Sequence, residues 1–551
     1  MFVRKLKRKT TQNIAVQIVR NDRTKDGKVR QKIVRHMGTA PEGPALEALL
    51  HIAEQERLRI EESVQPTLFP SEHSAHAVLE ARHRKQSEEP IPLADIRKLE
   101  EVKRVCVGFH EVFGALYARM GLDQLFSTRY AMAARLFRQA VLLRLAAPGE
   151  SKLAHARQLS KEDGVEVPVH KFYRMMDAVD DRRIARLQSI VAREVTDLLG
   201  GKLDVLFFDV TTLSFASDKS DELRKKGYSK DGKHNRVQVV LALMQTRDGL
   251  PVGYELFEGN TADVKTLEPA IASLKARFAL DRVVFVADAG MLSADNVALL
   301  QSMGHDYVVA ARLRSMKAEQ LRKVTGTLSW QATGDGRKVT EVSIGDRRLI
   351  LRYCPKRAAK DAHELEQAVK KARKRLASGV KGSGRNARYL KVKRGAVKLN
   401  AAAVERDRQL EGLHGVWTSL KASSGQQVYA QYGGLWQIEE GFRVLKHTLA
   451  IRPVFHWTER RVRAHIAICF AAFAMLRILR RIYNTRHGAE APISEGQILA
   501  QLREVEVSVV RDNTTKRHFA IPSAANSTKV RLYKALGLTI QRQTVPVEKD
   551  P

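Results

Sequence analysis

The spacing of apolar residues divides the chain into segments with a helical pattern and segments with a strand-like pattern. Between residues 107 and 199, apolar residues recur every three or four positions, as in AARLFRQAVLLRLAAP and IARLQSIVAREVTDLL, which is the spacing of amphipathic helices. From residue 204 the apolar runs become short and β-branched, as in DVLFFDVTTLSF, RVQVVLALMQT and RVVFVADAG. The pattern therefore predicts a helical module followed by a mixed sheet.

The two ends of the chain also carry strand signals. Near the N-terminus, IAVQIVR and KVRQKIVRHMG flank NDRTKDGK, whose Asp26–Gly27 pair is a hairpin signal. A helical run is predicted from about residue 44 to 62, and the prolines and polar residues that follow predict a surface linker. Near the C-terminus, VEVSVVRDNTTKRHFAIP predicts an edge hairpin.

Residues 316–420 mix several patterns. The strand-like run KVTEVSIGDRRLILRYC precedes a charged helical run, KDAHELEQAVKKARKRLAS, and a stretch rich in glycine and arginine, GVKGSGRNARYLKVKRG. This mixture predicts an insertion attached to the sheet. In the glycine-rich part, which lacks the residues for a core, contact with phosphate groups is expected.

The charge of the chain is strongly unbalanced. It contains 95 Lys and Arg against 61 Asp and Glu, a formal net charge of +34. Such an excess favours a polyanionic partner, and nucleic acid fits because each neutralised phosphate releases counterions. A membrane surface and a basic protein with no nucleic-acid role are the alternatives. The apolar run HIAICFAAFAML at residues 465–476 is too short to span a bilayer and predicts a buried core helix.

The three cysteines are scattered, with no partner two to four residues away. This pattern indicates neither a disulfide framework nor a zinc knuckle and fits a reducing cytoplasm. The basic N-terminus lacks an apolar core long enough for a signal peptide.

Two acidic residues follow apolar strand-like runs. Asp209 follows residues 205–208, and Asp288 comes shortly after residues 283–286, with SADN beyond it as a helix N-cap signal. A single aspartate in such a place often only caps a turn or a helix. Two of them in one domain favour a functional pair at the ends of neighbouring strands.

A third acid lies in the stretch YGGLWQIEEGFRVLKHTLAIRP at residues 432–453. On one continuous helix, Tyr432, Glu439 and Lys446 fall within about 20° of one another, with Arg443 about 40° to one side. Glu439 borders the apolar face, whereas Glu440 points about 180° away from it and is predicted to be solvated. The alternative reading of this stripe is an exposed face held by i,i+4 ion pairs.

Three converging carboxylates suit hard divalent cations, which prefer oxygen ligands. Two such ions can activate an attacking oxygen and stabilise a leaving one in phosphoryl transfer. Without metal, the carboxylates would repel one another. Arg443 and Lys446 are placed to hold a phosphate group nearby, and Tyr432 to position a nucleic-acid strand.

These blocks resemble the DDE transposases of bacterial insertion sequences, in the superfamily with a Tyr-Arg-Glu-Lys signature on its last catalytic helix. Tyr432, Glu439 and Lys446 fall at the signature spacing, and Leu435 occupies the position of the arginine. FFDVTTLSF and VVFVADAGMLS resemble the first two catalytic blocks, and the resemblance covers roughly residues 204–476. The N-terminal VQIVRNDRTKDGKVRQKIVRHMG is similar to one branch of these proteins.

The resemblance implies an α/β fold with a ribonuclease-H-like catalytic core and a β-rich insertion, preceded by a small β-unit and a helical DNA-binding module. It implies two Mg²⁺ or Mn²⁺ ions held by Asp209, Asp288 and Glu439. It further implies DNA contacts by a set of residues on or just after the last catalytic helix, namely Tyr432, Trp436, Arg443, Lys446 and Arg452.

The expected segments are an N-terminal β-unit and helix at 1–62, a linker at 63–106, the helical DNA-binding module at 107–200, the catalytic core at 201–315 and 421–485, the insertion at 316–420, and a tail at 486–551.

The activity that the resemblance implies is cut-and-paste transfer of an element by 3′-hydroxyl attack. The expected partners are terminal inverted repeats, target DNA and a second copy of the chain in a synaptic dimer, with no membrane. The expected location is the bacterial cytoplasm, at the nucleoid. Two alternatives are a metal-dependent nuclease or resolvase of the same fold and a DNA-binding derivative without catalysis.

Overall fold

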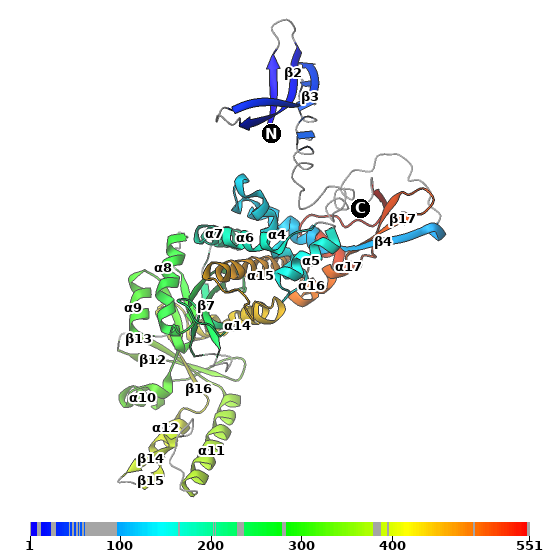
Figure 1. The fold of residues 1–551 in the computed structure, drawn as a ribbon. Helices are drawn as coiled ribbons and strands as arrows, with labels where there is room; N and C mark the ends of the chain where they lie inside the picture. Colours follow the sequence, from blue (N-terminus) through cyan, green and yellow to red (C-terminus); the bar gives the residue numbers. More distant parts are fainter. Residues whose placement is uncertain are drawn as a thin grey trace.

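The computed structural model describes most of the chain. The described residues are 2–7, 13–23, 29–42, scattered positions between 45 and 60, 96–163 and 166–547, with short gaps at 202, 204, 217, 229–235, 278–282, 292, 346, 378–386, 394–395 and 489–490. The fold is mixed α/β. Figure 1 shows its arrangement, with a small N-terminal sheet, a helical layer, a large sheet and an elongated extension.

The N-terminal unit is a three-stranded antiparallel sheet in the order β1-β2-β3. Ile14 and Val16 of the middle strand pack with Ala40 and Leu46 in a core of their own. The described positions between 45 and 60 are helical, in agreement with the predicted helical run. Residues 63–95 of the predicted linker lie outside the described residues. The strands are β1 (Phe2–Lys7), β2 (Asn13–Arg23) and β3 (Val29–Pro41).

The predicted linker extends too far, because its last part is a strand. β4 (Leu99–Cys106) pairs antiparallel with β17 (Glu506–Asp512) near the C-terminus. β17 also pairs with β18 (His518–Pro522), which confirms the predicted hairpin, and β18 pairs with β19 (Val545–Val547). The hairpin is not at an edge, since β4 covers β17 and β19 covers β18.

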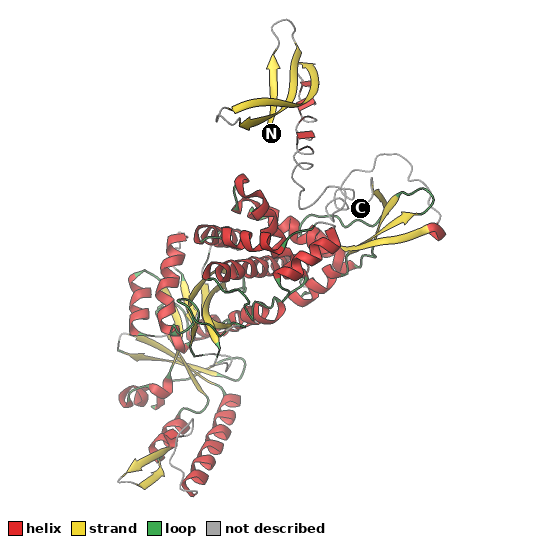
Figure 2. Ribbon diagram, in the orientation of Figure 1, coloured by secondary structure: helices red, strands yellow, loops and turns green. Residues whose placement is uncertain are grey.

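The helical pattern before residue 200 is confirmed. Its amphipathic helices bury their apolar stripes against one another and against the long helix α15 (Glu459–His487), as Figures 1 and 2 show. The helical elements are η2 (Phe109–Phe113), α3 (Gly114–Arg119), η3 (Leu122–Leu125), η4 (Thr128–Tyr130), α4 (Ala131–Ala146), α5 (Lys152–Asp163), α6 (Val169–Ala178) and α7 (Asp181–Leu198).

α15 contains the apolar run that was predicted to be a core helix. Within the described residues it is the one helix that is long and apolar enough to cross a membrane, yet 94% of its apolar window is buried in the protein. Its burial confirms the prediction of a core helix.

The large sheet has ten strands, in the order β11-β12-β13-β16-β10-β9-β5-β7-β6, with β8 also paired to β7. β9 is parallel to both β5 and β10, and the other pairs are antiparallel. The central strands are β5 (Val205–Ser214), β6 (Lys225–Lys226), β7 (Val237–Thr246), β8 (Pro251–Glu258), β9 (Val284–Ala287) and β10 (Asp306–Ala311).

Helices cover both faces of this sheet. α8 (Leu267–Arg277) and α9 (Ala294–Ser302) lie on one side in Figure 1, and α14 (Trp436–Arg443) and α15 lie on the other. The predicted N-cap before α9 is confirmed, because the Ser293 side chain accepts a hydrogen bond from the Asn296 amide. The apolar strands therefore contribute to cores on both faces of the sheet.

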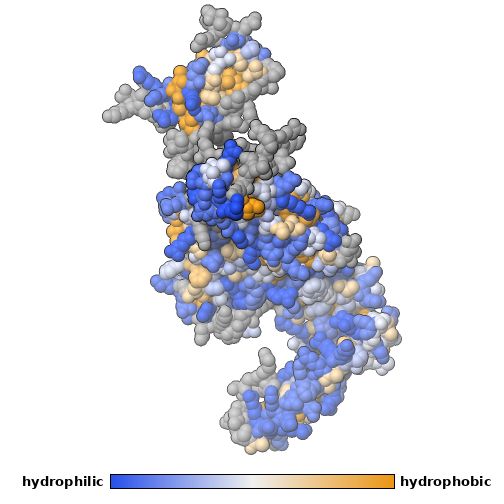
Figure 3. All heavy atoms as spheres, turned by 90° about the vertical axis from the view of Figure 1, so that its right-hand side faces the viewer, coloured by the Kyte–Doolittle hydropathy of each residue, from blue (hydrophilic) through white to orange (hydrophobic). Residues whose placement is uncertain are grey.

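The insertion has the predicted strands, the predicted charged helix and the predicted attachment to the sheet, but its described residues include more helix than strand. β12 (Lys338–Ile344), β13 (Arg347–Tyr353) and β16 (Leu413–Thr418) join the sheet beside β10, with β11 (Gln331–Ala332) at the edge. The remaining elements are α10 (Ala318–Thr325), α11 (Pro355–Ala377), α12 (Ala401–Gln409), β14 (Leu390–Lys393) and β15 (Ala396–Leu399). Part of the glycine-rich stretch lies outside the described residues. Hydrophilic side chains dominate the lowest part of the molecule in Figure 3, which holds α11.

The stretch predicted as one long helix is three elements. α13 (Gly425–Gly433) ends before α14, and α14 continues into the π-helical turn η9 (Val444–Thr448). Gly433 and Gly434 lie at the break, where two glycines make a helix interior unfavourable. The chain then reaches α15, α16 (Glu495–Arg503) and α17 (Ser527–Ala535).

Candidate functional site

Two carboxylates lie side by side where β5 and β9 stop pairing. The last parallel pair between these strands joins Phe208 to Ala287, so Asp209 and Asp288 are the next residue on each chain. Neighbouring strands are about 4.8 Å apart. Asp288 follows the end of β9, as predicted, but Asp209 lies inside β5, because β5 continues to Ser214 against β7. Asp209 is half-buried and Asp288 is exposed.

The face of the sheet that carries Asp209 is the face covered by α14. Side chains alternate along a strand, so Asp209 shares its face with Phe207. A Cβ atom at Gly434 would lie 2.5 Å from Cζ of Phe207. A Cβ atom at Gly441 of α14 would lie even closer to Nε2 of Gln245 on β7. The two glycines let the helical segment lie directly on the strands next to Asp209.

The helix break changes where the predicted stripe lies. Tyr432 is on α13, Glu439 on α14 and Lys446 in η9. The helical-wheel angles assumed one continuous helix, so they do not apply across the turn at Gly434 and Leu435 or into the π-helical turn. Leu435, at the signature arginine position, is the N-cap of α14 and packs against the core.

The prediction for the adjacent glutamates was also wrong. Glu439 is exposed and Glu440 is half-buried. One face of α14, with Ile438 and Phe442, packs on the sheet, but α15 covers Glu440. Oε2 of Glu440 lies 3.3 Å from Nη1 of Arg477. The helical wheel assumed a single buried face, whereas α14 lies between the sheet and α15. Glu440 contacts the α15 side through Arg477.

Asp288 and Glu439 both act electrostatically on Tyr432. Burial, followed by the negative charges of Asp288 and Glu439, raises the pKa of Tyr432 to about 12. Among the described residues, Glu439 makes no hydrogen bond or ion pair, and Asp288 accepts one from the amide of Ala289 at 2.7 Å. The charges of Asp288 and Glu439 thus favour the protonated form of the Tyr432 hydroxyl.

Sequence reasoning missed His414 and Arg352, which come from the insertion. The His414 ring lies 5.1 Å from the Tyr432 ring. Burial, followed by the charges of Arg357 and Arg352, lowers the pKa of His414 to about 4, and Asp288 opposes this shift. The Arg352 guanidinium lies 4.5 Å above the Tyr429 ring. Only the pairing of β13 with β16 brings these side chains to the acids, and nothing in their local sequence signals it.

The residues predicted to contact DNA have different surroundings. Trp436 is 53% exposed on α14, and the Arg443 side chain is 70% exposed, 3.6 Å from Glu440. Lys446 and Arg452 are both half-buried. Of the five residues, Tyr432 is influenced electrostatically by Asp288 and Glu439, and Trp436 and Arg443 are exposed on the same helix as Glu439.

The three acids have the right ligand atoms for divalent cations, but their side chains are not close enough together to hold one. Asp209, Asp288 and Glu439 supply only oxygen ligands, which Mg²⁺ and Mn²⁺ prefer. Across the part of the chain that the structure describes, no group of three His, Cys, Asp or Glu is close enough to hold a metal ion. Binding would therefore require the Glu439 side chain to approach the two aspartates.

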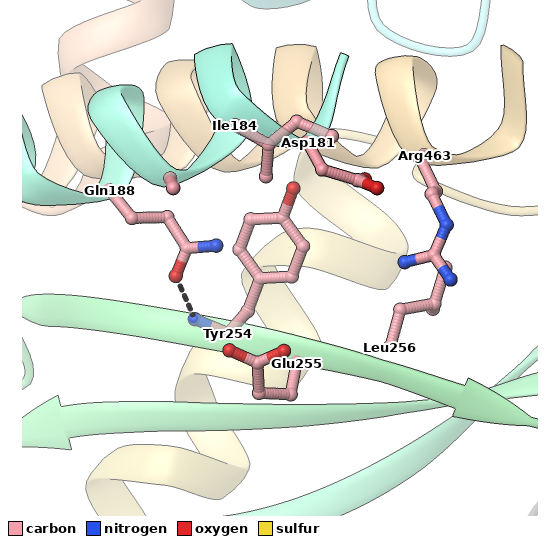
Figure 4. A pocket seen from close by; sticks show the side chains of 8 residues that line it. Asp181, Ile184, Gln188, Tyr254, Glu255, Leu256 and Arg463 are labelled. Carbon is pink, nitrogen blue, oxygen red and sulfur yellow. Dashed lines mark hydrogen bonds between the residues drawn. The ribbon is translucent and has the colours of Figure 1, made fainter. Parts of the chain in front are cut away.

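A separate pocket of about 160 Å³ lies between α7, β8 and α15. Figure 4 shows Tyr254 at its centre, with Gln188 accepting a hydrogen bond from the Tyr254 amide at 3.0 Å. Asp181 and Arg463 lie at its other side. None of the predicted site residues lines this pocket, so it is distinct from the carboxylates.

The predicted acids thus come from two adjacent strands and from a helix that lies across them on an α/β fold. A family model described as "Transposase DDE domain" matches residues 200–475, half of the chain. The chain therefore belongs to the DDE transposase family. A search of curated proteins finds no significant match.

Two solved structures are similar to the chain at low identity. One is the piggyBac transposase synaptic complex with hairpin DNA, with 12% identity, a TM-score of 0.37 and coverage of 72% of this chain and 76% of that one. Another is the Mos1 transposase paired-end complex with the left transposon end, with 16% identity, a TM-score of 0.15 and coverage of 33% and 59%. Both are too different from this chain to locate its site.

Proposed function

We propose that this protein is the transposase of a bacterial insertion sequence, which binds the terminal inverted repeats and moves the element by DNA cleavage and 3′-hydroxyl transfer in a cut-and-paste reaction. The observation that carries the proposal is the register of β5 and β9, which brings Asp209 beside Asp288 under the helix that bears Glu439. Membership of the DDE transposase family supports it. In this proposal the large sheet is a ribonuclease-H-like core, and two copies of the chain act in a synaptic dimer.

Asp209, Asp288 and Glu439 would hold two Mg²⁺ or Mn²⁺ ions. When bound, such ions activate the attacking oxygen and stabilise the leaving oxygen of phosphoryl transfer. The ions would also neutralise three carboxylates that otherwise repel one another.

The side chains around the acids have roles of their own in this proposal. Tyr432 keeps its proton at every ordinary pH, because its pKa is raised to about 12. Its hydroxyl therefore remains a hydrogen-bond donor, able to orient a carboxylate or a DNA phosphate that binds beside it. Trp436 and Arg443, exposed on the same helix, would contact the bound DNA by stacking and by charge.

The test is a cleavage assay with DNA that carries the element's ends, purified protein and Mg²⁺. We expect cleavage and joined strand-transfer products from the wild type and neither from Asp209→Asn, Asp288→Asn or Glu439→Gln. Asp218→Asn, at an exposed aspartate beyond the end of β5, is the matched control and should remain active. Full activity in any of the three variants would contradict the assignment of the triad.

The same assay separates the alternatives. Cleavage without joined products would indicate a nuclease or resolvase of the same fold. DNA binding without cleavage, combined with no heat of Mn²⁺ binding by calorimetry, would indicate a derivative that only binds DNA. Leu435 stands where the signature has an arginine, which is a reason to test for DNA binding without cleavage. The variant Leu435→Arg tests whether restoring the arginine changes cleavage.

A further inference from the structure

A cluster of cationic and imidazole side chains lies buried where α4, α5 and α15 meet. Arg144, Lys152 and His155 are 2%, 3% and 0% exposed. His465 and Cys469 reach them from α15 and are also buried. We call Arg144, Lys152, His155, His465 and Cys469 the cation cluster.

Among the described residues, the cation cluster has no neutralising acid. Besides burial, Arg144 lowers the pKa of Lys152, and Lys152 and Arg144 lower the pKa of His155. The Cys469 thiol opposes the shift of Lys152, but burial raises the pKa of this thiol too. His465 experiences Arg144, His456 and Lys152. No carboxylate appears among these influences. Burying cations without counter-charge is strongly unfavourable, which points to a missing anion.

Polar atoms in the cluster also lack partners. The Nε atom of Arg144 and both ring nitrogens of His155 are buried and make no hydrogen bond to any described residue. The Ala147 carbonyl acts on His155 electrostatically, but outside hydrogen-bond geometry. Buried polar groups in proteins are normally satisfied, so unpaired donors beside two cations are a second sign of a ligand.

The N-terminus of α5 adds to the positive potential. Lys152 is the first residue of this twelve-residue helix, and Ser151 caps it by accepting a hydrogen bond from the Ala154 amide at 3.1 Å. Helix N-termini carry partial positive charge and attract anions. The cationic side chains and the helix end therefore act in the same direction.

We propose that the cation cluster binds a phosphate oxyanion, with Arg144 and Lys152 as its charged ligands and His155 as a further donor. This phosphate site would be separate from the site formed by Asp209, Asp288 and Glu439. It lies under the segment that follows η9, because Ile451 places its carbonyl 2.9 Å from Nε2 of His465. Gly149, in the turn before α5, also meets Ala450 of that segment. An anion held here would fix the chain that leaves α14 and η9.

The ligand could be free phosphate or one phosphate of bound DNA, and the two sources share this chemistry. The experiment is thermal unfolding of the full chain in inorganic phosphate, compared with chloride at the same ionic strength. We expect a saturable rise in Tm of a few degrees that is specific to phosphate. Phosphorus-31 NMR titration gives the affinity and should show one tight site.

Arg144→Met and Lys152→Met should each weaken phosphate binding by at least about tenfold, because each removes a charge-assisted contact. Removing an unpaired buried charge seldom prevents folding, so both variants should remain folded without phosphate. Should one of them fail to fold, the other still decides the outcome. Arg157→Met, at an exposed arginine on the same helix, is the control and should bind phosphate like the wild type.

A Tm rise of equal size in chloride and phosphate would overturn the proposal, because it would show general screening of the net charge. Equal phosphate affinity in Lys152→Met and the wild type would overturn it as well. A short DNA duplex then separates the sources of the bound phosphate. Release of the tightly bound phosphate on addition of DNA identifies a DNA phosphate as the ligand, and retention identifies free phosphate.

Discussion

Arg144 and Arg477 are equally buried, at 2% exposure each, but their surroundings differ. Arg477 of α15 has two carboxylates within ion-pair distance, with its Nη1 atom 3.3 Å from Glu440 and 2.9 Å from Glu495. Arg144, in the cation cluster, has none among the described residues. Arg477 thus forms ion pairs that connect helices of the fold. Arg144 belongs to a group of like charges for which the described residues provide no opposite charge.

The carboxylates next to the sheet are a second set of like charges, of the opposite sign and in a different environment. Asp288 and Glu439 are exposed, so water screens their repulsion until a cation binds. Lys152 and Arg144 are not exposed, so the protein must either shift their protonation or supply an anion. Because the cation cluster is buried and the carboxylates are largely exposed, we expect the cation cluster to have the larger effect on the free energy of unfolding.

The largest expected effect comes from removing a charge in the exposed set. Asp288→Asn should reduce DNA cleavage on the order of 10²- to 10³-fold, as does loss of one charge-stabilising group in other active sites. Its free energy of unfolding should stay within about 0.5 kcal/mol of the wild type, as for other surface substitutions. Cleavage rates and urea denaturation measure the two effects. A large loss of stability would show that Asp288 is structural.

Glu440→Gln should have the opposite profile. It removes one of two carboxylates from buried Arg477, and we expect a loss of roughly 2–3 kcal/mol in the free energy of unfolding, less than for a fully unpaired buried charge because Glu495 remains. Urea denaturation measures this loss. The neighbouring Glu439→Gln is the control and should unfold like the wild type. If the two variants had the same free energy of unfolding, Glu440 would not stabilise the fold more than Glu439 does.

The pH dependence of unfolding tests the buried set. Burial, followed by the charge of Arg144, lowers the pKa of Lys152 to about 7 from 10.5. Between these values the unfolded chain binds more protons than the folded one, so Lys152 makes stability rise with pH, by up to about 1.4 kcal/mol per unit. Below pH 7 the full penalty is present.

The measurement is the free energy of unfolding of the wild type and Lys152→Met between about pH 7.5 and 9, without phosphate. We expect a steeper rise with pH for the wild type. His155, His456 and His465 stay neutral in this window, since burial lowers the pKa of each, to about 4 for His456. Burial raises the pKa of Cys469, which therefore titrates above it. Parallel curves would show that Lys152 titrates like a surface lysine.

The sequence predicted those features that depend on local pattern. Apolar runs that end in an acid identified Asp209 and Asp288, and helical periodicity identified the layer before residue 200. The assignment of Glu440 failed because its burial depends on α15, far along the chain, and the single helix failed at Gly433 and Gly434. Lys152 and His155 look like the surface of a basic helix, and only the packing of α4 and α15 shows that they are buried.

Arg443 of α14 offers the smallest effect, since its side chain is 70% exposed. Its exposed side chain pairs with Glu440 at 3.6 Å, and such a pair contributes about 0–1 kcal/mol. Arg443→Ala should therefore hardly change unfolding. If Arg443 contacts a DNA phosphate, the substitution should weaken binding to all sequences alike and reduce the slope of log affinity against log salt by about one. Filter binding across a salt series measures the slope, and an unchanged slope would place Arg443 outside the DNA path.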